Sequence, residues 1–155
     1  GMQPGYGFRA LLPGGASTDF LVAEHLDLPM EYEAIAAAGS RLGTGTVMVV
    51  DDRVCPVRLA LNLQRFFARE SCGFCTPCRE GLPWLVSILE DIEAGRGVPG
   101  DLEVLARNAD HIGTPGHTFC LHATGAMEPL TSGLRFFRED FEEHLATGTC
   151  RYGAP

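Results

Sequence analysis

Hydrophobic and polar positions follow two different patterns along the chain. Before residue 55, short apolar runs alternate with glycine and proline, and the runs 8–12 and 46–50 have the length and composition of strands. Residues 21–26 form another short, largely apolar stretch, and residues 31–38 predict a short helix that ends at Gly39. We expect a small α+β segment with too few strands for a self-sufficient sheet.

After residue 55 the apolar positions recur at helical spacing, in four stripes that predict four amphipathic helices. The stripes are Leu59, Leu63, Phe66 and Phe67; Leu85, Ile88, Leu89 and Ile92; Leu102, Leu105, Ala106 and Ala109; and Leu130, Leu134, Phe137, Phe141 and Leu145. Short glycine-containing connections separate them, which favours a four-helix bundle. The predicted fold class is therefore α+β, with a strand-containing domain at 1–54, a four-helix bundle at 55–150 and a tail at 151–155.

The chain has 155 residues and the composition of an ordinary globular protein. Twelve basic residues stand against 20 acidic ones, and no basic run occurs, so a nucleic-acid-binding surface is not expected. No apolar stretch reaches 18 residues, and the N-terminus lacks the layout of a signal peptide. These features predict a cytoplasmic protein without a segment that inserts into the membrane.

Four of the six cysteines form a pattern with a chemical meaning. Cys72, Cys75 and Cys78 make a C-x2-C-x2-C run, and Cys120 follows after 41 intervening residues. Three thiols within seven residues can surround one polynuclear centre, and a remote fourth thiolate completes the shell. Four cysteine ligands are the set that holds a [4Fe–4S] cluster. The run lies between the first and second predicted helices and Cys120 precedes the fourth, so both can meet at one end of the bundle.

Zinc is the alternative metal for four cysteines. Structural zinc sites usually pair two ligands with two, whereas a split of three and one is commoner for iron–sulfur clusters. With zinc bound, the chain would be an assembly or interaction module instead of an electron carrier. A disulfide framework is disfavoured, because nothing in the sequence indicates secretion.

The two remaining cysteines and two of the histidines are not expected to bind the metal. We expect Cys55 to be a buried, inert thiol and Cys150 to be exposed in a short tail, with neither in the ligand set. His117 and His122 flank Cys120, and a hydrogen bond to a cluster sulfur is favoured for them over metal ligation.

Three further predictions concern charged and aromatic residues. Arg79 follows the third cysteine and can offset the negative charge of a thiolate cluster. Trp84 is expected in the core of the second helix. The acidic group at 139–143 is expected to be a solvated helix face.

Three segments carry a resemblance to a known family: GSRLGTG (39–45), NLQRFFARESCGFCTPCREG (62–81) and TFCLHATGAMEPL (118–130). They resemble the C-terminal part of the NADH-binding flavoprotein subunit of respiratory complex I. NAD-dependent formate dehydrogenases and NAD-reducing hydrogenases share this module and remain alternatives. PGGAST (13–18) is similar to the soluble-ligand-binding β-grasp domain of these proteins, so the resemblance implies a partial β-grasp domain at 1–54.

The resemblance implies that Cys72, Cys75, Cys78 and Cys120 hold the [4Fe–4S] cluster that accepts single electrons from FMN reduced by NADH. FMN and NADH would bind in the parent subunit outside this chain, because Gly43-Thr-Gly45 is not a dinucleotide fingerprint. We therefore expect no NADH oxidation by this chain alone. The expected partners are other subunits of an NADH-oxidising complex, peripheral to the membrane. The chain is either an excised piece of a longer subunit or a naturally short relative.

Overall fold

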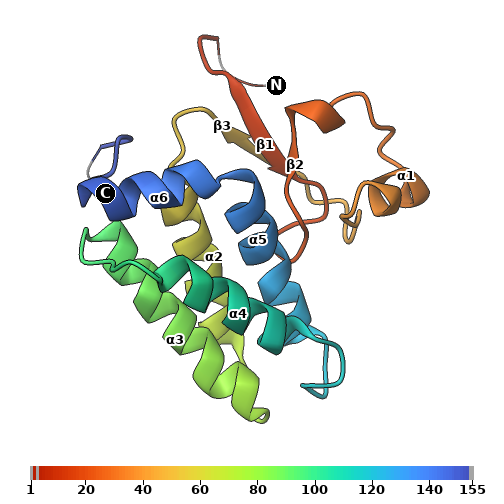
Figure 1. Ribbon diagram of the computed structural model, residues 1–155. Coiled ribbons are helices and arrows are strands. Elements are labelled where there is room, and N and C mark those ends of the chain that lie inside the picture. Colours follow the sequence, from red (N-terminus) through yellow and green to blue (C-terminus); the bar gives the residue numbers. More distant parts are fainter. Residues whose placement is uncertain (1, 3, 154–155) are drawn as a thin grey trace.

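A small antiparallel sheet stands beside a group of helices in the computed structural model, which describes residues 2 and 4–153 (Figure 1). The strands are β1 (Phe8–Leu12), β2 (Leu21–Val22) and β3 (Met48–Asp51), in the order β2-β1-β3. A 3-10 turn, η1 (Ala23–His25), follows β2. The helices are α1 (Tyr32–Ala37), α2 (Pro56–Glu70), α3 (Thr76–Glu93), α4 (Asp101–Gly113), α5 (His122–Phe136) and α6 (Arg138–Thr147). The α+β class is confirmed; residue 1 of the predicted first domain, residue 3, and residues 154–155 of the predicted tail lie outside the described residues.

The sheet depends on the helices for its core. Alternation along β1 buries Ala10 and Leu12 completely. Phe20, just before β2, packs edge-on against Phe137 between α5 and α6, with ring centroids 5.3 Å apart. One continuous cluster of buried side chains therefore runs from the sheet into the helices.

Leucine-rich faces of the helices form much of the core. Leu82, Leu85 and Leu89 of α3 are fully buried, and each such side chain contributes roughly 1.5–3 kcal/mol. Gly81 lets α3 approach α4, because a Cβ there would lie 2.5 Å from Ile112 Cδ1. A buried polar side chain on α2, Gln64, donates its amide to the backbone oxygen of Ala126 on α5 at 2.7 Å.

The predicted fourth helix is two helices. α5 ends and α6 begins around Phe137, whose φ of −121° and ψ of 25° leave the helical region. Phe137 and Phe141 are both buried, so the apolar stripe continues through the break and hides it from a periodicity analysis. Five helices thus occupy the described residues after Cys55, and the four-helix bundle is not confirmed.

Three predicted core positions lie on the surface. Trp84 is 53% exposed and Phe66 is 41% exposed, and Ala106 is exposed as well. The predicted core position of Trp84 is wrong, because the buried face of α3 is completed by the leucines on either side of it. Among the described residues, no helix combines the length and apolar character needed to cross a membrane.

Asp140 contradicts the predicted solvated acidic face, because it is buried at 3% exposure. Arg9 of β1 donates to its Oδ2 at 2.5 Å, while Arg151 and Tyr152 donate to its Oδ1 at 2.6 and 2.7 Å. This network joins the sheet, α6 and the C-terminal segment. Two arginines and a hydroxyl satisfy the carboxylate, as a buried charge requires.

We expect Asp140→Asn to lower the free energy of unfolding by about 3 kcal/mol, because it leaves Arg9 partly buried without its anion. Denaturant unfolding of the reduced, metal-free chain measures the effect. The matched control is Glu139→Ala, which removes the exposed neighbouring carboxylate and should change stability by less than about 0.5 kcal/mol. Equal effects of the two substitutions would contradict the proposed role of the network.

Glu128 on α5 makes a second link to the sheet segment. Its Oε2 lies 2.9 Å from Arg41 Nη2. Burial raises the pKa of Glu128, Arg41 lowers it and the nearby Asp19 carboxylate raises it, with a net pKa of about 7. The folded protein therefore binds a proton at Glu128 more tightly than the unfolded chain does.

This pKa predicts a loss of stability as pH rises. Because the folded pKa exceeds the ordinary value of 4.5, the contribution of Glu128 is fully present below about pH 4.5 and is lost as pH rises through about 7. Wild type should therefore lose up to about 3 kcal/mol relative to Glu128→Gln across this range. Unfolding free energies at pH 5 and 8 test this, with Glu33→Gln on the exposed face of α1 as control. A constant difference between wild type and Glu128→Gln would refute the titration.

Candidate iron–sulfur site

The predicted site cysteines gather at one end of the helices. Cys72 lies in the connection from α2 to α3, and Cys75 is the N-cap of α3. Cys78 lies in the first turn of α3, which begins at Thr76, so it is helical and not part of an inter-helix loop as the sequence suggested. Cys120 precedes α5, in the connection after α4 drawn at the lower right of Figure 1.

The two cysteine-bearing connections contact each other directly. The backbone N–H of Phe119 donates to Cys75 Sγ at 3.3 Å. The rings of Phe74 and Phe119 also pack edge-on, with centroids 5.5 Å apart. The residue next to Cys120 thus touches the C-x2-C-x2-C run across 44 positions of sequence.

Cys78 is the most enclosed of the four thiols. It is 7% exposed, whereas Cys72 and Cys120 are exposed and Cys75 is intermediate. Burial raises the pKa of the Cys78 thiol; the nearby sulfurs of Cys120, Cys72 and Cys75 raise it further, while its contact with Ser71 lowers it. All four sulfurs therefore share one electrostatic neighbourhood, with Ser71 Oγ 3.2 Å from Cys78 Sγ.

Arg79 and Gly73 shape the cysteine loop. Gly73 adopts a positive φ of 76°, a conformation that favours glycine, and its N–H donates to Ser71 Oγ at 3.2 Å. Arg79 Nη1 donates to the Gly73 oxygen at 2.9 Å. A guanidinium is thus tied to the loop that carries the thiols, where it can offset negative charge.

The two histidines near Cys120 make hydrogen bonds to backbone oxygens instead of the expected hydrogen bonds to sulfur. His122 Nε2 lies 2.8 Å from the Phe67 oxygen, and His117 Nδ1 lies 2.6 Å from the His111 oxygen. The contacts to sulfur come from Ser71 and from the Phe119 amide, which sequence reasoning missed. A hydrogen bond from a backbone amide cannot be predicted from the residue type. The contact from Ser71 could have been, because Ser71 stands directly before Cys72 in the sequence.

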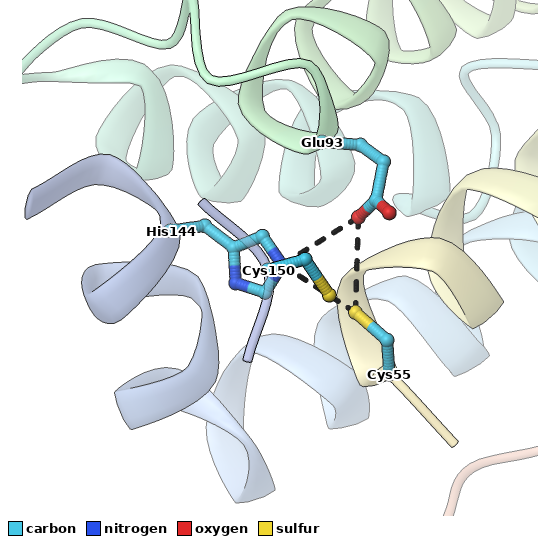
Figure 2. A group of neighbouring side chains, drawn as sticks. All are labelled: Cys55, Glu93, His144 and Cys150. Atoms are coloured by element: carbon cyan, nitrogen blue, oxygen red, sulfur yellow. Dashed lines mark hydrogen bonds and ion pairs between the residues drawn. The ribbon is translucent and has the colours of Figure 1, made fainter. Parts of the chain in front are cut away.

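The structure also corrects the role expected of Cys150. Its side chain is only partly exposed and packs against the core. Together with Cys55, it meets Glu93 and His144 at the opposite end of α2 and α3 (Figure 2). Cys55 is buried as predicted. No local motif could reveal this group, because its members come from four separate parts of the chain.

Residues 58–144 match the family model described as the NADH-ubiquinone oxidoreductase-F iron-sulfur binding region. The chain belongs to this family. It is 58% identical over 142 residues to the F subunit of NADH-quinone oxidoreductase in Escherichia coli K12, covering 92% of this chain and 32% of that protein. Its identity to the F subunit of the Streptomyces coelicolor enzyme is 47% over 152 residues, covering 98% of this chain and 33% of that protein.

A solved structure shares the fold. An NAD+-reducing [NiFe]-hydrogenase in the H2-reduced state matches 90% of this chain and 23% of the hydrogenase chain, with a TM-score of 0.78 and 35% identity. The comparisons confirm the predicted family, its iron–sulfur binding region and the [4Fe–4S] cofactor. The chain spans about a third of the length of the curated relatives it matches.

We expect the helices to persist without metal. The buried leucines of α3 lie beyond the cysteine loop and pack against other helices, so the core does not depend on the thiols being bound. After reduction and removal of metal with a chelator, the chain should retain most of its helical signal in far-UV circular dichroism. Leu85→Ala should lower the free energy of unfolding of this metal-free chain by about 2–5 kcal/mol. Loss of most of the signal on chelation would instead mean that metal supplies the folding free energy.

Proposed function

We propose that Cys72, Cys75, Cys78 and Cys120 bind one [4Fe–4S] cluster, through which the chain transfers single electrons as part of an NADH-oxidising complex. The observation that carries the assignment is the 3.3 Å hydrogen bond from the Phe119 amide to Cys75 Sγ. It brings the segment of the remote fourth cysteine beside the run of three. The family match over residues 58–144 supports the same chemistry.

The surrounding residues suit thiolates that hold iron. Hydrogen-bond donors close to sulfur stabilise negative charge, and the Phe119 amide and Ser71 hydroxyl occupy such positions. Arg79 adds a positive charge on the same loop. When bound, the cluster supplies reversible one-electron redox chemistry. The protein's part is to hold four sulfurs in place and to set the local charge.

One side of the proposed site is open. Phe74 is 73% exposed and Phe119 is 89% exposed, and exposed aromatic residues of this size are frequent at protein interfaces. We propose that another subunit of the complex covers this side and exchanges electrons there. The relatives are named as subunits of NADH-quinone oxidoreductase or as an NAD+-reducing hydrogenase, and both support a role within a larger assembly, peripheral to the membrane.

The strand-containing segment is proposed to derive from a β-grasp domain, with the five later helices as the cluster-carrying unit. The three strands all lie before Cys55 and the five helices α2 to α6 all lie after it, which supports this division. We propose the module of an NADH-quinone oxidoreductase in preference to that of a hydrogenase, because the quinone oxidoreductase relatives reach 58% identity against 35% for the hydrogenase.

Anaerobic reconstitution tests the cluster. We expect about four irons and four sulfides per chain, with broad visible absorbance. Cys120→Ser should hold at most about three irons per chain, because the remaining three sulfurs leave one iron without a protein ligand. The control is Cys150→Ser, which removes a thiol at the other end of the helices and should keep all the iron.

Several results would contradict the assignment. They are a stoichiometry of two irons, full incorporation of iron into Cys120→Ser, or a colourless chain that holds zinc in four-sulfur coordination after reconstitution with iron. Two irons would replace the proposed cluster by a [2Fe–2S] centre, and full incorporation into Cys120→Ser would exclude Cys120 as a ligand. Bound zinc would remove the electron carrier and favour an assembly module instead.

A further inference from the structure

A second group of ligating side chains lies at the end of α2 and α3 remote from the proposed cluster (Figure 2). Cys55, Glu93, His144 and Cys150 each offer one ligand atom, and these four atoms all lie within 4.8 Å of one another. Cys55 and His144 are 3% and 2% exposed. The side chain of Glu93 is 10% exposed.

The spacing of these atoms is that of ligands around a single small ion. Cys55 Sγ lies 3.5 Å from His144 Nε2 and 3.7 Å from Glu93 Oε2. His144 Nε2 lies 3.6 Å from Glu93 Oε2. Metal–ligand bonds of about 2.0–2.3 Å at tetrahedral angles place neighbouring ligand atoms about 3.3–3.8 Å apart. The three distances among Cys55, Glu93 and His144 fall in this range, and Cys150 Sγ lies within 4.8 Å of all three atoms.

Outer contacts orient each ligand toward the common centre. His144 Nδ1 lies 2.6 Å from the backbone oxygen of Asp140. Because a carbonyl only accepts, Nδ1 carries a hydrogen, and in the neutral imidazole Nε2 then has the lone pair that a metal needs. Arg58 holds the other oxygen of Glu93 at 2.8 Å and donates its backbone N–H to Cys55 Sγ at 3.4 Å. Such second contacts are the usual companions of metal ligands.

The fold brings the four residues together through a close backbone contact. Cys55 is the N-cap of α2, Glu93 ends α3, and Cys150 follows the turn after α6. The turns after α3 and α6 meet at Gly95 and Gly148, where a Cβ on Gly95 would overlap the Gly148 backbone oxygen. Only glycine at position 95 allows this approach, which carries Cys150 to the ends of the other helices.

We propose that Cys55, Glu93, His144 and Cys150 bind one zinc(II) ion in a closed, structural site. Two thiolates with an imidazole and a carboxylate favour zinc over calcium or magnesium, which take oxygen ligands. Two thiolates and one carboxylate carry three negative charges, which zinc and the Arg58 guanidinium balance. Four protein ligands leave no position for substrate, so the ion joins the C-terminal segment to α2, α3 and α6.

A cation also resolves a conflict within the group. When the His144 imidazole is neutral, its Nε2 lone pair and the Glu93 carboxylate oxygen face each other at 3.6 Å as two acceptors. An ion between them turns this repulsion into shared coordination. The site does not depend on the proposed cluster, since no residue belongs to both groups.

The test uses the full chain with its iron–sulfur cluster reconstituted, then reduced, supplied with zinc and freed of excess metal. Elemental analysis should give about one zinc per chain beside about four irons. X-ray absorption at the zinc edge should show two sulfur and two nitrogen or oxygen ligands. Cys150→Ser should lower bound zinc at least about tenfold while iron stays unchanged.

A matched pair on α3 separates ligation from general charge. Glu93→Gln should weaken zinc binding at least about tenfold, whereas Glu90→Gln, at a partly exposed carboxylate one turn earlier, should leave it unchanged. Circular dichroism verifies that each variant is folded. Three results would overturn the proposal. They are zinc bound by four sulfur ligands, equal amounts of zinc in wild type and Cys150→Ser, and a Cys55–Cys150 disulfide that forms again after reduction and keeps zinc out. Failure of the cluster assignment would appear separately, as missing iron.

Discussion

The packing of α2 against α3 determines where the chemistry of this chain can occur. The two helices are joined by the short cysteine-bearing connection and therefore run antiparallel, with their leucine faces buried against each other and against α5. One end of the pair presents Cys72, Cys75 and Cys78. The other presents Cys55 and Glu93. A helix of 15 to 18 residues is about 22–27 Å long, so the two groups of thiols are held apart by a rigid core.

Local sequence patterns were sufficient for features that depend on neighbouring residues. The strand at Phe8–Leu12, most of the buried apolar positions of α2 to α4 and the spacing of the cysteine run follow from periods of two, three or four residues. The run of three cysteines was informative because thiols at this spacing have few structural uses apart from holding a metal centre. Helix ends were less accessible: α3 begins within the cysteine run, where Pro77 occupies a position that favours helix initiation.

Features that depend on distant parts of the chain could not be predicted in the same way. Asp140 sits in an acidic stretch typical of a solvated face, yet Arg9 and Arg151 reach it from remote segments and make its burial favourable. The break at Phe137 is invisible because the buried residue there continues the apolar stripe. Cys150 follows the last helix in the sequence, but in the structure its side chain lies close to Cys55 at the start of α2. Each case is a tertiary contact that overrides a local expectation.

The contact between the turns at Gly95 and Gly148 limits how this region can change in length. Backbone touches backbone there, without a side chain that could adopt another rotamer to absorb a shift. An inserted residue between Gly148 and Cys150 would rotate the chain and carry the thiol out of register with His144. The nearby residues 98–100 are exposed, and an insertion there would disturb the turn before α4 without moving a buried side chain of that loop. Two loops at the same end of the protein therefore differ sharply in their tolerance of insertions and deletions.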